Sequence, residues 1–178
     1  MIAYFVLVLA FADRIFAHML GPQMIHFTAM GGSLLYFGAR RSRWNALLVL
    51  LMLMAADYYL TTVVYRLPFH APDYLVTWAW GVGVFLLGHG LLSRKTTLLR
   101  VAGGVLGSAT AFYVLVDFAV WLGRMYPHTL AGFIACYVAA LPFYRNDLAS
   151  TAVVAGVLFG VPALARKLMP AWRERTVA

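Results

Sequence analysis

Six long apolar segments follow one another along the chain, separated by short turns that carry many of its charged residues. The segments are longer than the roughly 10 residues of a transmembrane β-strand and lack its alternation, so the pattern predicts membrane-spanning α-helices, which need about 20 residues. We therefore expect an all-α polytopic membrane bundle, forming one integral membrane domain over residues 1–178 with a polar cytoplasmic tail at 166–178. The predicted helices cover residues 2–20, 24–39, 44–65, 74–92, 98–123 and 148–165.

A further apolar stretch, residues 129–144, is short and contains Pro142. If only the six longer segments span, ten basic residues fall on the side of the N-terminus, and the positive-inside rule makes that side cytoplasmic. If residues 129–144 spanned as well, the basic tail would lie on the opposite side. We therefore expect this stretch to be a re-entrant or surface helix on the outer face. The ten residues are Arg40, Arg41, Arg43, Arg94, Lys95, Arg100, Arg166, Lys167, Arg173 and Arg175.

The composition agrees with lipid as the solvent. Hydrophobic residues make up 63% of the chain and charged residues 11%, with a mean hydropathy of +0.83, whereas soluble domains carry about a quarter charged residues. The net charge of +8 follows from basic cytoplasmic turns, so we predict no nucleic-acid partner. The expected location is the bacterial inner membrane, in contact with membrane lipid, with both termini cytoplasmic.

Ionisable residues within the apolar segments carry the functional signal. A charge at the bilayer centre costs about 2.5–3.5 kcal/mol on insertion scales, yet Asp13, Arg14, Asp57 and Asp117 lie inside predicted helices. In the predicted topology all four fall in the outer half of the membrane, which indicates a polar cavity open to the outside. The alternative is structural pairing, with Arg14 neutralising Asp57 or Asp117, and the two interpretations are compatible.

Further polar and aromatic residues fall at the same depth. We expect His26 and Arg145 to join the four buried charges in binding a substrate, and we expect the rings of Phe27, Trp121 and Tyr126 to stack on it. The predicted substrate-binding residues are therefore Asp13, Arg14, His26, Phe27, Asp57, Asp117, Trp121, Tyr126 and Arg145.

The sequence gives little support to metal or enzyme chemistry. The five histidines do not form an HExxH motif, and the single Cys136 excludes a Cys-x-x-Cys pair. His26 and His89 lie at different predicted depths, which disfavours paired haem ligation. No set of nucleophile, base and orienting group can be assembled from spacing. We expect no metal, no cofactor and no enzymatic activity.

Small residues recur at four-residue spacing at Gly103, Gly107 and Ala111 in the fifth segment. Such a face lets two helices approach closely. It either packs inside the bundle or docks against a larger membrane complex or an energising module.

Residues 13–32 (DRIFAHMLGPQMIHFTAMGG), residues 121–160 and the Ala-Ala-Asp at 55–57 together resemble an uncharacterised family of bacterial membrane proteins assigned to transport, domain of unknown function 6580. That family is in turn similar to the S components of energy-coupling-factor vitamin transporters. The resemblance implies an S-component-like bundle, in which a short helix between the fifth and sixth spans covers the outer opening of the binding site. Residues 129–144 occupy that position.

The sequence departs from the family pattern in three places. Residues 23–29 lack the prolines and the asparagine of the family's proline-rich element, and Asp117 stands where the family has asparagine. The first helix also lacks the regularly spaced small residues through which S components dock on an energising ATPase module.

Two functions are carried forward. The first is an S-component-like membrane transport protein that binds a small polar or amphipathic molecule from the outer face. The alternative is an accessory structural subunit packed inside a larger membrane protein complex.

Overall fold

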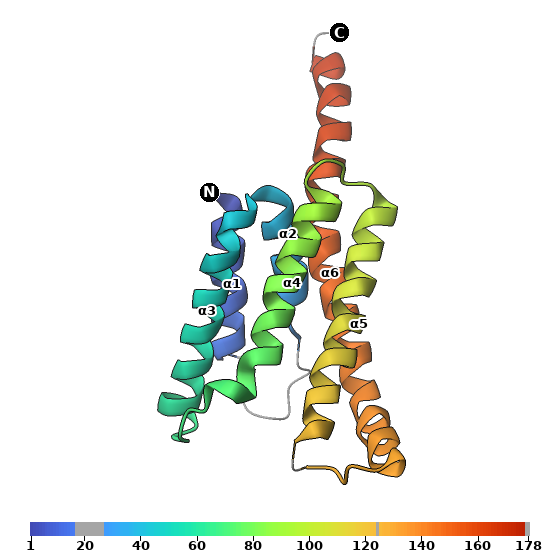
Figure 1. The fold of residues 1–178 in the computed structure, drawn as a ribbon. Coiled ribbons are helices and arrows are strands. Elements are labelled where there is room, and N and C mark those ends of the chain that lie inside the picture. The colour runs from blue at the N-terminus through green and yellow to red at the C-terminus, as the bar shows by residue number, and fades with distance from the viewer. Residues whose placement is uncertain (17–26, 124, 177–178) are drawn as a thin grey trace.

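The computed structural model describes residues 1–16, 27–123 and 125–176, and within these ranges every regular element is helical (Figure 1). This confirms the predicted all-α class. Short helical turns flank two of the helices: the 3₁₀ turn Arg43–Asn45 precedes α3, the π-helical turn Leu60–Val64 follows it, and the 3₁₀ turn Ala71–Tyr74 precedes α4. The α-helices are α1 (Ile2–Phe16), α2 (Met30–Arg40), α3 (Ala46–Tyr59), α4 (Leu75–Leu92), α5 (Leu98–Leu122) and α6 (Leu130–Thr176).

Four helical segments among the described residues are long and apolar enough to cross a membrane: Arg43–Val64, Ala71–Leu92, Leu98–Leu122 and Leu130–Ala165. The first three agree closely with the predicted third, fourth and fifth helices. The described part of α1 has 15 residues. The second helix was predicted at 24–39, but α2 has only 11 residues and begins at Met30, because the described residues 27–29 are not helical. At 1.5 Å per residue α2 extends only about 16 Å, roughly half the hydrocarbon core.

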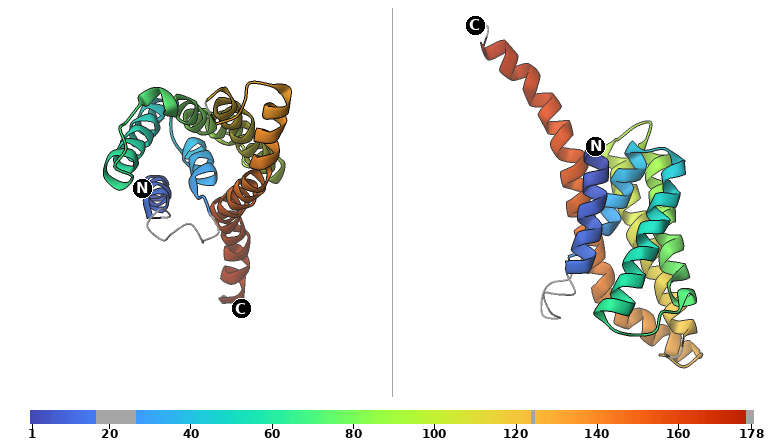
Figure 2. Two further views of the ribbon diagram at one scale, coloured as in Figure 1. Left: turned by 90° about the horizontal axis from the view of Figure 1, so that it is seen from below. Right: turned by 90° about the vertical axis from the view of Figure 1, so that its left-hand side faces the viewer.

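The C-terminal part of the chain differs from the expected arrangement. The sequence predicts a short helix at residues 129–144, separate from the span at 148–165, but this prediction is wrong: α6 runs without interruption from Leu130 through both and on to Thr176. Pro142 removes one backbone donor and bends a helix without having to end it. Figure 2 shows the first part of α6 running in a different direction from the rest.

The short helix α2 lies at the centre of the bundle, inside an arc formed by α3, α4, α5 and α6 (Figure 2). Every residue from Met30 to Gly38 is buried. Gly38 and Gly88 allow α2 and α4 to touch backbone to backbone, because a Cβ at Gly38 would overlap the Phe85 carbonyl and one at Gly88 would overlap the Leu35 carbonyl. Close approach through glycine is a typical device of membrane helix packing.

The predicted small-residue face on α5 points outward. Gly103 is exposed and has open space around it, while a Cβ at Gly107 would meet only the Leu87 side chain. The inner side of α5 is instead formed by Gly104, Val105, Ser108 and Ala109, all buried. Packing within the bundle therefore uses the neighbouring face of the helix.

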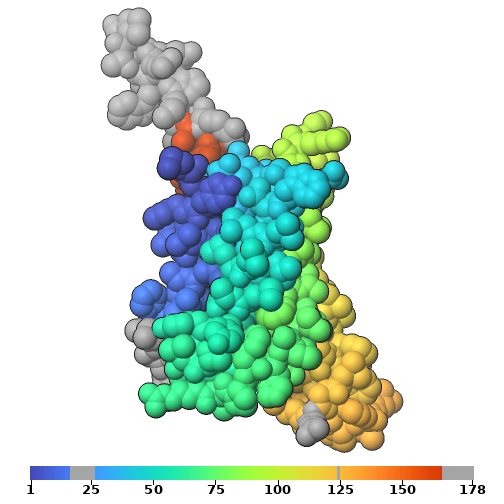
Figure 3. All heavy atoms as spheres, turned by 60° about the vertical axis from the view of Figure 1, so that its left-hand side comes forward, coloured from blue at the N-terminus to red at the C-terminus, as the bar shows by residue number. Residues whose placement is uncertain are grey.

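The two ends of the bundle differ in their chemistry. The N-terminus, the α2–α3 turn, the α4–α5 turn and the last turns of α6 lie at one end (Figure 1), and these segments hold the ten basic residues named above. We call this the basic end. The end of α1, the α3–α4 connection and the α5–α6 connection lie at the other, which we call the opposite end. In the space-filling view, α1 and α3 lie side by side, and the α3–α4 connection forms the opposite end below them (Figure 3).

Candidate functional site

Near the opposite end, an ion pair between α1 and α3 and a hydrogen bond from α4 connect three helices. Arg14 Nη2, in the last turn of α1, donates to Asp57 Oδ1 of α3 over 2.6 Å, and Trp78 Nε1 of α4 donates to Asp57 Oδ2 over 2.8 Å. Asp57 is only 2% exposed and the Arg14 side chain 29%. Both carboxylate oxygens thus have a partner, and of the two partners predicted for Arg14 the structure shows Asp57.

An aromatic stack holds Trp78 in place. The rings of Phe69, Tyr74 and Trp78 contact one another, with centroid distances of 5.3 Å between Phe69 and Tyr74, 6.1 Å between Tyr74 and Trp78, and 6.4 Å between Phe69 and Trp78. The Tyr74 hydroxyl lies 2.6 Å from Thr61 Oγ1 within the π-helical turn. Beyond that turn Arg66 adopts a left-handed conformation with φ 54°, which helps the chain reverse toward α4. The α3–α4 connection therefore fixes the indole that completes the pairing of Asp57.

A second cluster of polar residues connects α1 and α6, by hydrogen bonds, to the residues just before α2. The Ala29 N–H donates to Asp13 Oδ2 over 3.2 Å, and the Thr28 hydroxyl donates to Asp147 Oδ1 over 3.0 Å. Buried polar atoms normally find hydrogen bonds, yet Asp147 Oδ2 and Thr151 Oγ1, four residues apart on α6, have no partner among the described residues.

A cleft of about 360 Å³ opens between α1, α2 and α6 beside this group. Its polar lining residues are Asp13 of α1 and Ser33 of α2, and Phe27 lies at its edge with 43% of its surface exposed. Its walls are aliphatic side chains of α1 and α6, including Val157 and Leu158. A carboxylate, a hydroxyl and an aromatic ring over an apolar wall suit a small amphipathic molecule.

The other predicted site residues are distributed elsewhere. Asp117 and Trp121 lie on α5 against the start of α6: the Cys136 thiol donates to the Asp117 carbonyl over 3.4 Å, and Trp121 donates to the Pro127 carbonyl over 3.2 Å. Tyr126 lies in the α5–α6 connection and Arg145 is exposed on α6. His26 lies outside the described residues.

The structure thus brings four predicted residues together around α1, namely Asp13, Arg14, Phe27 and Asp57. Asp117 and Trp121 lie on α5 and Tyr126 in the connection that follows it. In Figure 1, α5 lies on the side of the bundle away from α1 and α3.

Sequence reasoning missed three partners of this site: Trp78, Thr28 and Ser33. For Trp78 a signal existed, because an indole N–H at the outer end of the fourth helix lies at the predicted depth of Asp57. Thr28 and Ser33 gave no comparable signal, since a hydroxyl in an apolar helix also bonds its own backbone.

Metal ligation finds no support in the described residues, where no three His, Cys, Asp or Glu side chains converge. Among the described histidines, the His89 ring instead lies 2.9 Å from the Arg41 carbonyl and the His128 ring 3.1 Å from the Gly123 carbonyl.

The described residues form a helical bundle with four candidate membrane spans and a partly buried ion pair between two helices, which indicates an α-helical membrane protein. Within that class, the chain belongs to the family of unknown function DUF6580, whose model matches residues 1–172. No curated protein and no solved structure matches the chain.

Proposed function

We propose that this protein is an S-component-like membrane transport protein that binds a small amphipathic molecule in the cleft between α1, α2 and α6. The observation that carries the proposal is the cleft itself, which combines Asp13, Ser33 and Phe27 with an apolar wall.

The charges around the cleft define the ligand's chemistry. Arg14 is paired with Asp57, so the cleft's own ionisable group is Asp13, which accepts one hydrogen bond from the Ala29 N–H. A carboxylate in a low-dielectric site favours a cationic or hydrogen-bond-donating partner. The ligand is therefore an amine-bearing or donor-rich molecule with an apolar or aromatic body that contacts Phe27 and Val157.

The direction of capture follows from the charge distribution. Basic turns are retained on the cytoplasmic side of membrane proteins, so the basic end faces the cytoplasm and both termini lie there. Asp13 lies in the last turns of α1, toward the opposite end. The molecule therefore enters from the outer face, which in a bacterial inner membrane is the periplasmic or external side.

A ligand screen with matched variants tests the proposal. The full-length protein in detergent is heated with vitamins and vitamin precursors, each beside an analogue without its amine. An amine-bearing compound present at about 100 times its Kd should stabilise the fold by about 2.7 kcal/mol, which is a rise of several degrees in Tm. Val157→Phe, which fills the cleft, and Asp13→Asn, which removes its charge, should abolish the rise.

Two controls accompany these variants. Val161→Phe adds the same bulk one turn along α6 at a position that is 60% exposed and outside the cleft lining, and Asp73→Asn removes an exposed carboxylate in the α3–α4 connection. Both should keep the full ligand response. The absence of any response in the wild type, or a response that survives Val157→Phe, would overturn the proposal. Co-purification in mild detergent with a large stoichiometric complex would then favour the accessory structural subunit.

A further inference from the structure

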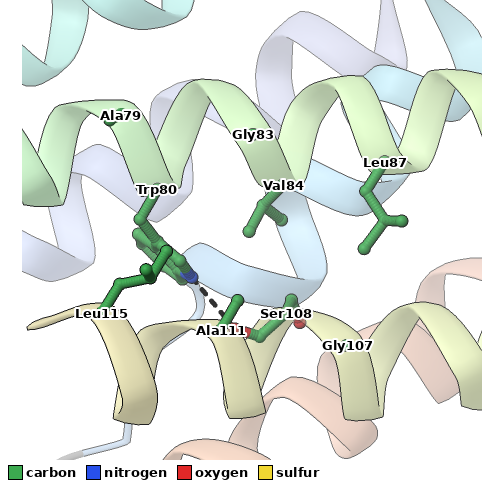
Figure 4. A pocket seen from close by; sticks show the side chains of 9 residues that line it. All are labelled: Ala79, Trp80, Gly83, Val84, Leu87, Gly107, Ser108, Ala111 and Leu115. Atoms are coloured by element: carbon green, nitrogen blue, oxygen red, sulfur yellow. Dashed lines mark hydrogen bonds between the residues drawn. The ribbon is translucent and has the colours of Figure 1, made fainter.

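The outward face between α4 and α5 holds a groove of about 370 Å³ (Figure 4). Small and aliphatic residues line it: Ala79, Gly83 and Leu87 on α4, and Gly107, Ala111 and Leu115 on α5. A Cβ added at Gly83 would meet nothing within 4 Å. The groove therefore exists because α4 and α5 carry glycine where larger side chains would have filled the gap.

The polar atoms at the floor of the groove are satisfied within the protein. Trp80 Nε1 donates to the Ser108 carbonyl over 2.9 Å, the bond drawn in Figure 4, and the Ser108 hydroxyl donates to the Val105 carbonyl over 3.0 Å. An occupant of the groove gains contact with apolar atoms and needs no hydrogen bond. A hydrocarbon chain meets that requirement.

The groove leads to a cluster of basic residues at the basic end. On α4 the lining positions 79, 83 and 87 continue at helical spacing to Gly90, and Arg94 lies in the turn just after α4 ends at Leu92. On α5 the positions 115, 111 and 107 continue to Gly103 and to Arg100. Gly90 and Gly103 both have open space around them. From Leu87 to the end of α4 at Leu92 the helix rises about 8 Å, and Arg94 follows two residues later in the turn.

The basic residues at this mouth are positioned to receive an anion. Arg94 and Lys95 are exposed in the α4–α5 turn. Arg100 is half-buried, and its Nη1 donates to the Leu91 carbonyl over 3.2 Å, which holds the guanidinium over the end of α4. Basic pockets between transmembrane helices are typical binding sites for anionic lipid head groups.

We propose that the α4–α5 groove binds an anionic phospholipid, with its phosphate at Arg94, Lys95 and Arg100 and one acyl chain along Gly83, Leu87 and Gly107. Charge complementarity at the mouth favours a lipid over a transmembrane helix of another protein, whose apolar span would gain nothing from three cations. A helix with its side chains is also about 10 Å across, so it would rest on the rim of the groove, whereas an acyl chain enters it. This site is independent of the transport cleft between α1, α2 and α6.

Native mass spectrometry of the delipidated full-length protein tests the site. The protein is titrated with phosphatidylglycerol or with phosphatidylcholine of the same acyl chains, and lipid occupancy gives each Kd. We expect phosphatidylglycerol to bind at least tenfold more tightly, and high salt to reduce the preference. Arg94→Gln combined with Lys95→Gln should weaken phosphatidylglycerol binding roughly 10- to 30-fold, at about 1 kcal/mol per basic residue.

The groove is tested separately from the charge. Gly83→Leu fills the groove and should weaken binding of phosphatidylglycerol with no change in charge. If Gly83→Leu fails to fold, Ala79→Leu serves as a second variant that fills the groove, one helical turn away on α4. Gly156→Leu on α6 adds the same side chain at another glycine with open surroundings. Arg40→Gln combined with Arg43→Gln removes two charges from the other basic turn. Both control variants should bind phosphatidylglycerol as the wild type does.

Four outcomes would overturn the proposal. Equal affinity for phosphatidylglycerol and phosphatidylcholine would show that no anion-selective site exists. If the Arg40/Arg43 variant lost as much phosphatidylglycerol affinity as the Arg94/Lys95 variant, the lipid would be attracted to the basic end as a whole. Full binding in the correctly folded Gly83→Leu and Ala79→Leu variants shows that the chain does not use the groove. The protein could also co-purify in mild detergent with a second membrane protein and lose it in the Gly83→Leu and Ala79→Leu variants. That result would identify a helix, and not a lipid, as the occupant of the groove.

Discussion

Asp57 shows how a single buried charge is accommodated between lipid-facing helices. Its two oxygens accept one hydrogen bond each, from Arg14 on α1 and Trp78 on α4. A buried ion pair adds little net stability when compared with apolar residues of the same size, whereas the loss of one partner leaves an uncompensated charge. The ion pair is therefore expected to affect stability mainly when one of its two partners is removed.

A double-mutant cycle at this pair gives a residue-scale prediction. Arg14→Leu and Asp57→Leu should each destabilise the protein by about 3–5 kcal/mol, because each leaves the other charge unpaired. The double variant should lose clearly less than the sum of the two single losses. Unfolding of the purified protein in detergent measures all three, and Arg145→Leu, at an exposed position on α6, should change stability by about 0.5 kcal/mol or less. Strictly additive losses would contradict a direct pairing.

At the scale of the elements, α2 organises the bundle. It is too short to cross a bilayer alone, yet it packs against α4 through Gly38 and Gly88 and against α6 through Gly31 and Gly32. Without a strong hydrophobic effect inside lipid, close packing of this kind drives the association of helices. The buried polar groups that α1 and α6 contribute are then connected through the residues just before α2.

The contact between α2 and α4 yields an element-scale prediction. Gly38→Ala and Gly88→Ala should each destabilise the protein by about 1–3 kcal/mol or more, because the added Cβ meets a backbone carbonyl that cannot move independently of its helix. Gly156→Ala and Gly160→Ala, where nothing lies within 4 Å, should be neutral or slightly stabilising, since alanine favours helix by up to about 1 kcal/mol. Thermal unfolding compares the four variants. Equal behaviour of the two pairs would show that the α2–α4 contact is not tight.

At the scale of the whole molecule, charge and polarity divide the bundle between its two ends. Ten basic residues belong to the segments at the basic end, while Asp13, Arg14 and Asp57 lie in helix turns near the opposite end. The groove between α4 and α5 runs toward the first end and the cleft at Asp13 lies toward the second. The two proposed sites would thus meet different leaflets of the membrane.

Labelling of single cysteines in intact cells tests this sidedness. In a Cys136→Ser background, which keeps a hydrogen-bond donor for the Asp117 carbonyl, His70→Cys should react with a membrane-impermeant maleimide, because it lies exposed in the α3–α4 connection. Thr96→Cys, exposed in the α4–α5 turn, should react only after the membrane is permeabilised. The reverse pattern would invert the proposed topology.

The proposed site shows how far sequence reasoning reached at single positions. The cost of charge in lipid identified Asp13, Arg14 and Asp57 and suggested Asp57 as one of two partners of Arg14, since few alternatives exist inside a membrane. Asp117 satisfied the same criterion but lies on the α5–α6 side. The depth of a residue in the membrane can be predicted by counting residues along its helix. The side of the bundle that its side chain faces depends on how the helices pack, and the sequence does not give that.

The apolar pattern by itself determined the class of the protein, the positions of α3, α4 and α5 and the segregation of its basic residues, because a lipid solvent imposes helix length and charge placement on any chain that crosses it. Only the tertiary structure decided that α2 is a short central helix, that α6 continues through Pro142, and that Gly103 and Gly107 face outward. These features depend on which surfaces meet, and many arrangements of apolar helices have nearly the same hydropathy. Packing between backbones and a few buried hydrogen bonds select one of them.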